Sequence, residues 1–187
     1  MTKRLSECLL QVLNGSATKF AAVRFGNVIG SEGSVVPLFL WQMSKGMPVT
    51  VTDARATRYF MLISEAAKLI IQAGVLGEGG EIFFLNMGEP VRIMKLAQNL
   101  IRLSGSVPDR DVPIAISGLL PGEKLREDLA LEREELFSTE HERIFKVRVR
   151  SFDHGEFRRD LETLRRLANE RDQKRVQAFI GEMAKRY

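Results

Sequence analysis

Apolar positions along the chain change repeatedly between helical and strand spacing. The first apolar face, within residues 2–13, follows helical spacing and is formed by Leu5, Cys8, Leu9, Val12 and Leu13. Short apolar runs bounded by glycine or polar residues predict strands at 20–25, 48–52, 59–63, 81–85, 112–116 and 143–149. Helices are predicted at 2–13, 34–45, 64–77 and 90–105, with two more after residue 150. Strands that alternate with helices indicate an α/β protein.

The helix after Ser64 carries the most detailed prediction of a buried face. Ser64 is expected to be its N-cap, because a serine hydroxyl accepts hydrogen bonds from the first free backbone N–H groups. The residues at helical spacing that are predicted to face the core are Ile63, Ala66, Ala67, Ile70, Ile71 and Gly74. Further along, residues 118–125 are predicted to form a turn that leads into a short helix.

Composition narrows the class of protein. A chain of 187 residues with 44% apolar content suits one globular domain, or one domain and part of another. It has no run of about 18 apolar residues, so no membrane-spanning helix is predicted. Its single cysteine, Cys8, excludes an internal disulfide and is interpreted as a core residue. No cysteine–histidine cluster has metal-ligand spacing, so no metal site is predicted. A cytoplasmic location is the default expectation.

The net charge of +4 is unevenly distributed. Residues 141–187 hold 13 Lys and Arg against 8 Asp and Glu, whereas residues 1–140 hold 15 against 16. A basic helical tail could contact nucleic acid or anionic lipid. Because acidic residues are interspersed with the basic ones, a solvated helix face is the favoured interpretation.

Polar residues gather in two clusters, at 24–37 and 48–60. Each cluster has the pattern of a strand followed by a glycine- and polar-rich loop, and an apolar segment, 38–43, lies between them. No G-x-G-x-x-G fingerprint occurs in the chain. The polar residues expected to converge on a ligand are Arg24, Asn27, Thr57 and Arg58.

Five segments, taken together and in order, resemble a known family. They are TKRLSE, RFGNVIGSEGSVVPLF, PVTVTDARATRYFMLISEAAKLI, GEGGEIFFLNMGEPVRI and GLLPGEKL, and they span roughly residues 2–145. They are similar to the C-terminal half of the CapD-type polysaccharide biosynthesis proteins, which are UDP-N-acetylglucosamine 4,6-dehydratases and related epimerases of the extended short-chain dehydrogenase/reductase superfamily. The resemblance ends near residue 145 and assigns no role to residues 146–187.

The resemblance implies the C-terminal part of an NAD(P)-binding Rossmann domain and a smaller α/β substrate domain. Residues 1–30 and 64–86 would supply the last Rossmann elements, and 31–63 with 87–140 the nucleotide-sugar lobe. Residues 141–187 would form an edge strand and a basic helical tail. The first predicted helix begins at residue 2 without a cap or a preceding strand, so we expect a truncated chain. Its open sheet edge would favour self-association.

The resemblance also assigns cofactor contacts. Lys3 matches the lysine that closes a Tyr/Met-x-x-x-Lys motif and holds the nicotinamide ribose, and it is the candidate catalytic residue. Phe25 and Gly26 match the segment beside the nicotinamide. The family oxidises C4 of the sugar by hydride transfer to NAD or NADP, eliminates water across C5 and C6, and returns the hydride. Because the sequence lacks the glycine-rich phosphate loop, we expect the chain alone to be inactive and to bind neither NAD nor NADP. The expected cytoplasmic location is compatible with membrane attachment through a region before Met1.

The substrate implied by the resemblance is a UDP-sugar. Arg58 matches the arginine that meets the diphosphate, and Asn27 matches an asparagine at the sugar-diphosphate end. The strand with Pro48, Val49 and Thr50 matches the one whose backbone reads uracil. Glu123 and Lys124 belong to the family's Leu-Arg-Pro-Gly-Glu-Lys motif. In this sequence Leu120 replaces the arginine of the motif, so a second diphosphate contact is lost unless Lys124 or Arg55 replaces it.

Each candidate also has a simpler explanation. Arg24 could pair with a carboxylate at the end of its strand, Asn27 could form a turn, and Arg58 could be solvated. Glu123 and Lys124 could cap the short helix, and Lys3 could be an ordinary exposed lysine. At the level of function, three hypotheses stay open. They are a dehydratase or epimerase portion, a non-catalytic nucleotide-sugar-binding or scaffold module, and a nucleic-acid-binding protein, of which the last is disfavoured because no aromatic residues are placed for base stacking.

Overall fold

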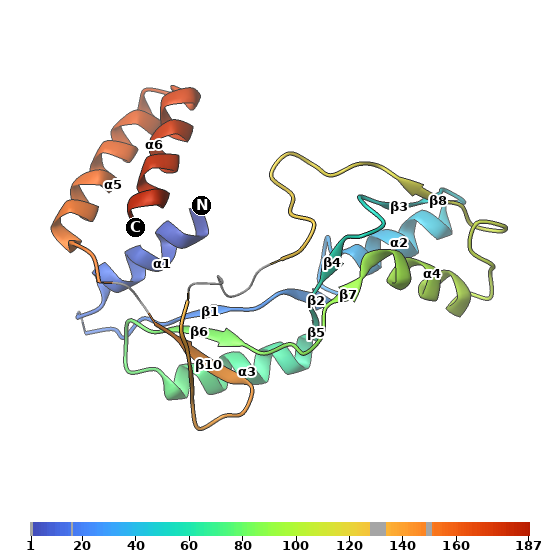
Figure 1. Ribbon diagram of the computed structural model, residues 1–187, viewed down its shortest axis with the longest axis horizontal. Coiled ribbons are helices and arrows are strands. Elements are labelled where there is room, and N and C mark those ends of the chain that lie inside the picture. Colours follow the sequence, from blue (N-terminus) through green and yellow to red (C-terminus); the bar gives the residue numbers. More distant parts are fainter. Residues whose placement is uncertain (1, 16, 128–133, 149–150) are drawn as a thin grey trace.

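A computed structural model gives the structure of the chain and describes residues 2–15, 17–127, 134–148 and 151–187 (Figure 1). The helices are α1 (Thr2–Leu13), α2 (Val35–Ser44), α3 (Ile63–Leu76), α4 (Ile93–Leu103), α5 (His154–Asn169) and α6 (Gln173–Arg186). The strands are β1 (Ala22–Arg24), β2 (Asn27–Ile29), β3 (Val49–Val51), β4 (Thr57–Arg58), β5 (Phe60–Leu62), β6 (Ile82–Leu85), β7 (Val91–Arg92), β8 (Ile114–Ile116), β9 (Leu136–Ser138) and β10 (Ile144–Val147). The α/β class expected from the sequence is confirmed.

The largest sheet has the strand order β1-β6-β10-β9. β1 and β6 are parallel, with Val23 opposite Phe83, and β10 is antiparallel to β6. Helix α3 follows one face of this sheet and packs Ala66, Leu69 and Ala73 into the core that also contains Phe83. The small side chains of the two alanines allow the helix to approach the strands closely.

A second core lies at the other end of the molecule, where α2 and α4 pack on the parallel pair β3 and β8 (Figure 1). Phe39, Val49 and Ile101 are fully buried there. Between the two cores, short pairs join β2 with β5 and β4 with β7. Asn27, Thr57 and Arg58, three of the four polar residues expected to converge on a ligand, therefore lie between the two cores.

A third core is made by α1 and the tail helices α5 and α6, which stand together at the upper left of Figure 1. Leu5, Cys8 and Val12 of α1 pack against Phe157 and Met183 of the tail, and Phe157 is fully buried. The expected tail helices and the expected buried position of Cys8 are confirmed. The expected edge strand is wrong, because β10 lies between β6 and β9 in the main sheet. Burial raises the pKa of the Cys8 thiol, so the thiolate is disfavoured.

The predicted buried face of α3 is correct at Ala66 but wrong at its other positions. Leu62, not Ser64, is the N-cap, and the sheet is contacted through Ala66, Leu69 and Ala73. Of the predicted core positions, Ile63, Ile70 and Ile71 expose 57%, 40% and 69% of their surface. The helix carries two apolar stripes, and periodicity alone does not say which of them meets the sheet.

Two other predicted boundaries also change. Helix α4 begins at Ile93, not at Pro90, because Val91 and Arg92 pair with β4 as strand β7. Residues 118–127 form a turn and extended backbone with no helix among the described positions. In place of a helix, backbone hydrogen bonds attach this segment to β4: the Thr57 N–H donates to the Leu125 carbonyl over 3.0 Å. No described helix is long and apolar enough to cross a membrane.

Candidate functional site

Arg58 is nearly enclosed, with 9% of its surface exposed. Its Nη1 donates to the carbonyl oxygens of Thr57 and Leu125, over 2.8 and 3.2 Å. Its Nη2 donates to Glu123 Oε1 over 2.9 Å, and its Nε lies 3.6 Å from Glu127 Oε1. The guanidinium is thus held by the segment 118–127 and is not a solvated surface group.

Glu123 makes several of the hydrogen bonds that attach the segment 118–127 to the strands beside it. Besides the contact with Arg58, its Oε1 accepts from the Thr52 hydroxyl over 2.9 Å, and its Oε2 accepts from the Leu120 N–H over 3.1 Å. Thr52 directly follows β3, so one carboxylate joins β3, β4 and the segment 118–127. Lys124 is exposed beside it. An anion that reached the guanidinium would therefore meet an arginine whose charge is already balanced by carboxylates.

Asn27 lies close to this arrangement through strand pairing. It opens β2, where it pairs with Phe60 of β5, and its backbone N–H donates to the Tyr59 carbonyl over 2.8 Å. Phe60 is two residues from Arg58. Asn27 therefore lies on β2, which pairs with β5, and Thr57 and Arg58 form β4, which ends one residue before β5 begins.

Gly26, just before Asn27, is required by packing. A Cβ at this position would lie 2.9 Å from Tyr59 Cβ and 3.0 Å from the Tyr59 carbonyl oxygen. Its backbone N–H points to Met87 Sδ, 2.8 Å away. The preceding Phe25 packs against the core under α3. Side chains of this chain thus occupy the space beside Gly26.

The two edges of β3 have different partners. The Val49 N–H donates to the Pro113 carbonyl over 2.9 Å, and the Ser117 N–H donates to the Val51 carbonyl over 3.0 Å. In a parallel pair, alternate residues direct their backbone groups to opposite sides, so Thr50 faces away from β8. The Thr50 N–H donates to Gln42 Oε1 over 3.1 Å, and its hydroxyl accepts from Gln42 Nε2 over 2.7 Å. The edge expected to read a base, which begins at Pro48, is therefore held by the buried amide of Gln42.

Arg24 does not join the other candidates. Its Nε and Nη2 donate to the carboxylate of Glu7 in α1, over 2.6 and 2.8 Å. Its Nη1 donates to Glu134 Oε2 over 2.6 Å. The hydrogen bond with Glu7, which outweighs burial, and the further bond with Glu134 raise the pKa of Arg24 above its usual range. The simpler explanation, in which Arg24 pairs with a carboxylate, describes this residue.

Lys3 lies in the first turn of α1 and is exposed. The next residue, Arg4, is tied to the C-terminus of the chain, since its Nε donates to the Tyr187 carbonyl over 2.9 Å. Tyr187 is buried in the third core. The helix that carries Lys3 is thus positioned by the tail helices and by the Arg24–Glu7 ion pair.

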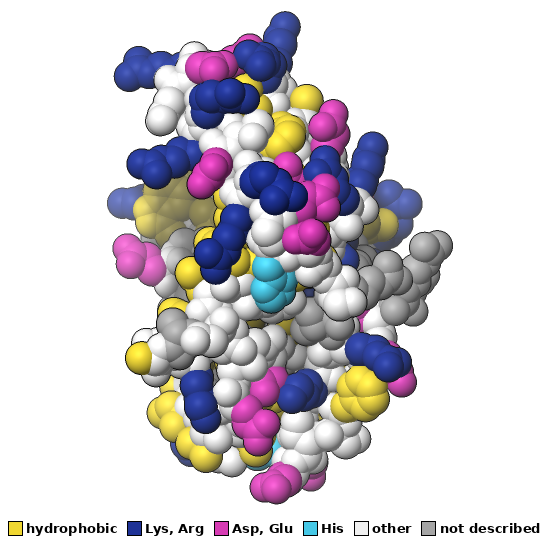
Figure 2. Space-filling view, turned by 90° about the vertical axis from the view of Figure 1, so that its left-hand side faces the viewer, with side chains coloured by type: hydrophobic (Ala, Val, Ile, Leu, Met, Phe, Trp, Pro, Cys, Tyr) yellow, Lys and Arg dark blue, Asp and Glu magenta, His cyan; other side chains and the backbone are white. Residues whose placement is uncertain are grey.

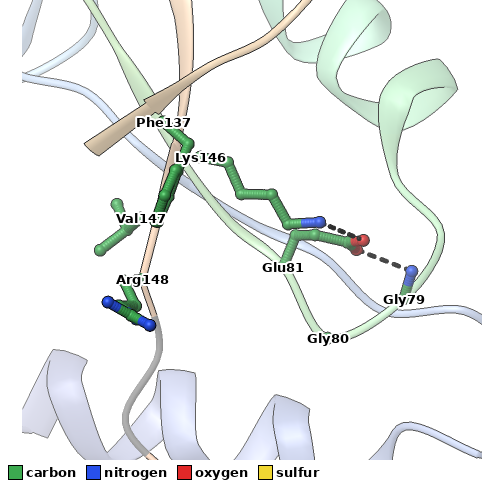
Figure 3. Close-up of a pocket in the computed structure, with 7 residues that line it drawn as sticks. All are labelled: Gly79, Gly80, Glu81, Phe137, Lys146, Val147 and Arg148. Atoms are coloured by element: carbon green, nitrogen blue, oxygen red, sulfur yellow. Dashed lines mark hydrogen bonds and ion pairs between the residues drawn. The ribbon is translucent and has the colours of Figure 1, made fainter. Parts of the chain in front are cut away.

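A pocket that the sequence does not reveal opens at one end of the main sheet (Figure 3). It is lined by Gly79, Gly80, Glu81, Phe137, Lys146, Val147 and Arg148. Glu81 accepts from the Gly79 N–H over 2.7 Å and from Lys146 Nζ over 3.2 Å. Burial raises the pKa of Glu81, but these hydrogen bonds outweigh burial and lower it overall. Glu81 is thus paired within the pocket, whereas Arg148 pairs with Glu135 outside its lining. No described cluster of His, Cys, Asp or Glu could hold a metal ion.

Comparison with known proteins gives a consistent set of relatives. A family model described as "Polysaccharide biosynthesis protein" matches residues 1–149. "Capsular polysaccharide biosynthesis protein CapD" of Staphylococcus aureus is 53% identical over 150 residues, which are 79% of this chain and 25% of that protein. A "UDP-N-acetylglucosamine 4,6-dehydratase (inverting)" of Campylobacter jejuni strain 81-176 is 31% identical over 78% of this chain and 42% of its own length.

Among solved structures, the X-ray structure of Pen from Bacillus thuringiensis superposes with a TM-score of 0.70 at 35% sequence identity. The match covers 78% of this chain and 46% of that one. The chain spans about a quarter of the length of CapD and less than half of the dehydratase.

Proposed function

Because the chain belongs to the polysaccharide biosynthesis protein family, we propose that it is the C-terminal, substrate-binding portion of a nucleotide-sugar 4,6-dehydratase or epimerase. The proposed substrate is a UDP-sugar that resembles UDP-N-acetylglucosamine. The similar dehydratase named for that substrate supports this choice. The proposed role is in the biosynthesis of a surface polysaccharide, in line with the name of the capsular relative.

The observation that carries the proposal is the convergence of three segments on the Arg58–Glu123 pair. β4 supplies the arginine, the end of β3 supplies Thr52, and the segment 118–127 supplies Glu123. A guanidinium fork matches two oxygens of a diphosphate, and its value is greatest where water is excluded. We propose that the diphosphate takes the place of Glu123 at Nη2 of Arg58, which frees the carboxylate to turn toward Lys124.

The other candidates are given roles around this point. Asn27, on the neighbouring β2, would bind the sugar-diphosphate end. The side of β3 that faces away from β8, at Pro48 and Thr50, would meet the uracil once the Gln42 amide moves. We further propose the division expected from the sequence, with residues 31–63 and 87–140 as the nucleotide-sugar lobe. The separate core formed by α2, α4, β3 and β8 supports this division.

The contacts proposed for a nicotinamide cofactor fit less well. Tyr59 and Met87 fill the space beside Gly26, and Phe25 packs into the core, so these residues form no cradle for a dinucleotide. Lys3 is exposed and would need a second wall to hold a ribose. Lys3 is therefore proposed as a cofactor contact only within a longer family protein.

Calorimetric titration of the chain with a panel of nucleotides tests the proposal. UDP and the UDP-sugar should bind. GDP should bind at least about tenfold more weakly, because the edge of β3 is proposed to recognise uracil. A tenfold difference in Kd corresponds to about 1.4 kcal/mol of binding free energy. NAD and NADP are included and are expected to give no heat of binding. Equal affinity for UDP and GDP would contradict a built nucleotide-sugar site and would indicate general attraction of anions.

A further inference from the structure

Gln42 is a polar side chain that the fold encloses. Among the described residues, the buried polar or charged side chains are Gln42, Arg58 and Glu81. Gln42 lies in the last turn of α2, and Figure 1 shows this helix beside β3. Its amide forms two hydrogen bonds with Thr50: Oε1 accepts from the backbone N–H over 3.1 Å, and Nε2 donates to the hydroxyl over 2.7 Å. One buried amide thus pairs with two atoms of a single residue of β3.

The orientation of the Gln42 amide follows from the chemistry of its partner. A backbone N–H only donates, so the amide oxygen must face the Thr50 N–H, and the amide NH2 then faces the hydroxyl. The amide therefore presents an acceptor and a donor, side by side, to the edge of β3 that faces away from β8. The pairing also closes the turn between α2 and β3, since the two residues are eight positions apart.

The Watson–Crick edge of uracil carries the same pair of groups. O4 accepts and the adjacent N3–H donates, whereas cytosine has a donating N4 amino group and an accepting N3 at these two positions. A uracil in place of the amide would accept from the Thr50 N–H through O4 and donate to the hydroxyl through N3–H. Cytosine in the same pose would set its amino group against the backbone donor, which leaves both donors unpaired.

We propose that the Gln42 amide is an internal stand-in for uracil, which the base of the nucleotide sugar must displace from Thr50. This inference rests on the function proposed above and adds a residue that sets affinity and base choice. The group that selects the base is fixed, because it belongs to the backbone of β3. The Gln42 side chain has several rotatable bonds and can turn away. The contact that it must give up lowers the affinity for a ligand that needs this edge.

The place of Thr50 relative to Arg58 suits a nucleotide. Thr50 and Thr52 are two positions apart, so their Cα atoms are separated by at most about 7 Å. Thr50 holds the Gln42 amide, and the Thr52 hydroxyl donates to Glu123, the partner of Arg58. At each end, the internal group has the chemistry of the ligand group proposed there. An anionic carboxylate lies where the diphosphate would bind, and an amide lies where the imide edge of uracil would bind.

The tail helices are the other surface that could attract an anionic nucleotide. Figure 2 shows dark-blue basic side chains over the upper part of the molecule, where α5 and α6 lie, with magenta acidic side chains among them. Arg175 pairs with Glu170, and Arg186 pairs with Asp160. A charged surface of this kind holds phosphates and does not distinguish one base from another. Selectivity between two pyrimidines therefore separates the edge of β3 from attraction by the tail.

Calorimetric titration of the unmodified chain with UDP and CDP tests the edge. The two ligands have the same charge and the same diphosphate, and they differ only in the base. UDP should bind at least about tenfold more tightly, because CDP would leave the Thr50 N–H against a donor. CDP is a sharper probe than GDP for this purpose, because guanine offers the same acceptor and donor as uracil and differs in ring size. Equal affinities for UDP and CDP would overturn the proposal.

Gln42→Met tests the stand-in itself. Methionine has nearly the length and shape of glutamine but cannot pair with Thr50. The melting temperature should fall, because the Thr50 N–H loses its partner. UDP should nevertheless bind at least about fivefold more tightly, because no amide has to be displaced, and CDP should gain less. Gln72→Met is the matched control: Gln72 is exposed on α3, and this variant should change neither the melting temperature nor the affinity.

Lower stability with higher affinity is a combination that a purely structural role of Gln42 does not produce. If Gln42 only closed the turn between α2 and β3, its loss would loosen the edge and weaken UDP binding. Weaker or unchanged UDP binding in Gln42→Met would therefore overturn the proposal. Gln42→Leu, which also cannot pair with Thr50, should repeat the result of Gln42→Met.

Arg58→Ala separates this inference from the function on which it rests. If UDP binding depends on Arg58 but does not increase in the Gln42 variants, the nucleotide-sugar site is retained and the stand-in fails. If the unmodified chain binds neither UDP nor CDP, both proposals fail. The expected result is that Arg58→Ala weakens UDP and CDP alike, whereas Gln42→Met strengthens UDP more than CDP.

Discussion

Nη2 of Arg58 donates to Glu123 Oε1 over 2.9 Å, and the two residues are 65 positions apart in the chain. Both were expected from the sequence to contact the substrate, and the structure shows that they contact each other. Arg58 and Glu123 are thus one unit, in which the carboxylate holds the cation where a diphosphate would bind. If a diphosphate binds at Arg58 as proposed, its affinity depends on how easily Glu123 is displaced.

Glu123→Gln tests this competition. The neutral amide keeps a hydrogen-bond acceptor near Arg58 but removes the negative charge that a diphosphate must displace. We expect UDP to bind several-fold more tightly and the melting temperature to fall, since charge-assisted hydrogen bonds are stronger than neutral ones. Calorimetry and thermal unfolding measure the two effects, with the exposed Glu140→Gln as the control. Weaker UDP binding in Glu123→Gln would show that Glu123 supports the ligand and does not compete with it.

Arg24 is expected to contribute mainly to stability. Arg24→Met removes the cation from between Glu7 and Glu134, whose carboxylates are each 15% exposed. Removing one partner from a buried ion pair lowers the free energy of unfolding by about 3–5 kcal/mol. Because this pair is partly exposed, we expect a loss of about 3 kcal/mol. Urea unfolding measures this loss. Arg148→Met, which breaks a pair with exposures of 67% and 55%, should change stability by less than about 1 kcal/mol. Similar losses in both variants would contradict this account of Arg24.

Gly26→Ala and Gly181→Ala should change stability in opposite directions. A Cβ at Gly26 would meet Tyr59 at 2.9 Å, and relief of such overlap costs typically about 1–3 kcal/mol. Gly181 lies inside α6 with no atom within 4 Å of its Cβ position, so alanine there should stabilise the chain by about 0.5–1 kcal/mol. Denaturant midpoints measure both changes. A neutral Gly26→Ala would show that Tyr59 moves away easily.

Stability should fall in acid partly through Glu81. Its pKa is lowered in the folded chain, because hydrogen bonds from Gly79 and Lys146 outweigh the effect of burial. A group whose folded pKa is lowered stabilises the fold above its unfolded pKa of about 4.3. That contribution is lost as the pH falls through the folded pKa. Between pH 5 and pH 3, Glu81→Gln should therefore lose less unfolding free energy than the unmodified chain, as measured by urea titration. Parallel pH profiles would contradict this assignment.

The sequence predicted well those features that depend on one clear stripe or on adjacent residues. Helix α1 buries Leu5, Cys8 and Val12, three positions of the face that its spacing predicts. Helix α3 was predicted with the wrong face, because either of its two apolar stripes could have met the sheet. The partners of Arg24 and Arg58 could not be predicted, because Glu134 and Glu123 lie 110 and 65 positions away. Local patterns identify a charged residue, but the fold decides which charge it meets.

The most direct test of the account is the affinity of UDP for Arg58 variants, measured by calorimetry with thermal unfolding as a check on folding. Arg58→Ala should weaken UDP binding about ten- to a hundredfold, since a charge-assisted contact contributes about 1.5–3 kcal/mol. Arg58→Lys should recover part of this loss, because an ammonium keeps the charge without the fork. Arg55→Ala is the control, as Arg55 is 76% exposed and paired with Asp53, and it should bind UDP almost normally. Equal losses in the Arg55 and Arg58 variants, or no loss in a folded Arg58→Ala, would contradict a diphosphate site at Arg58.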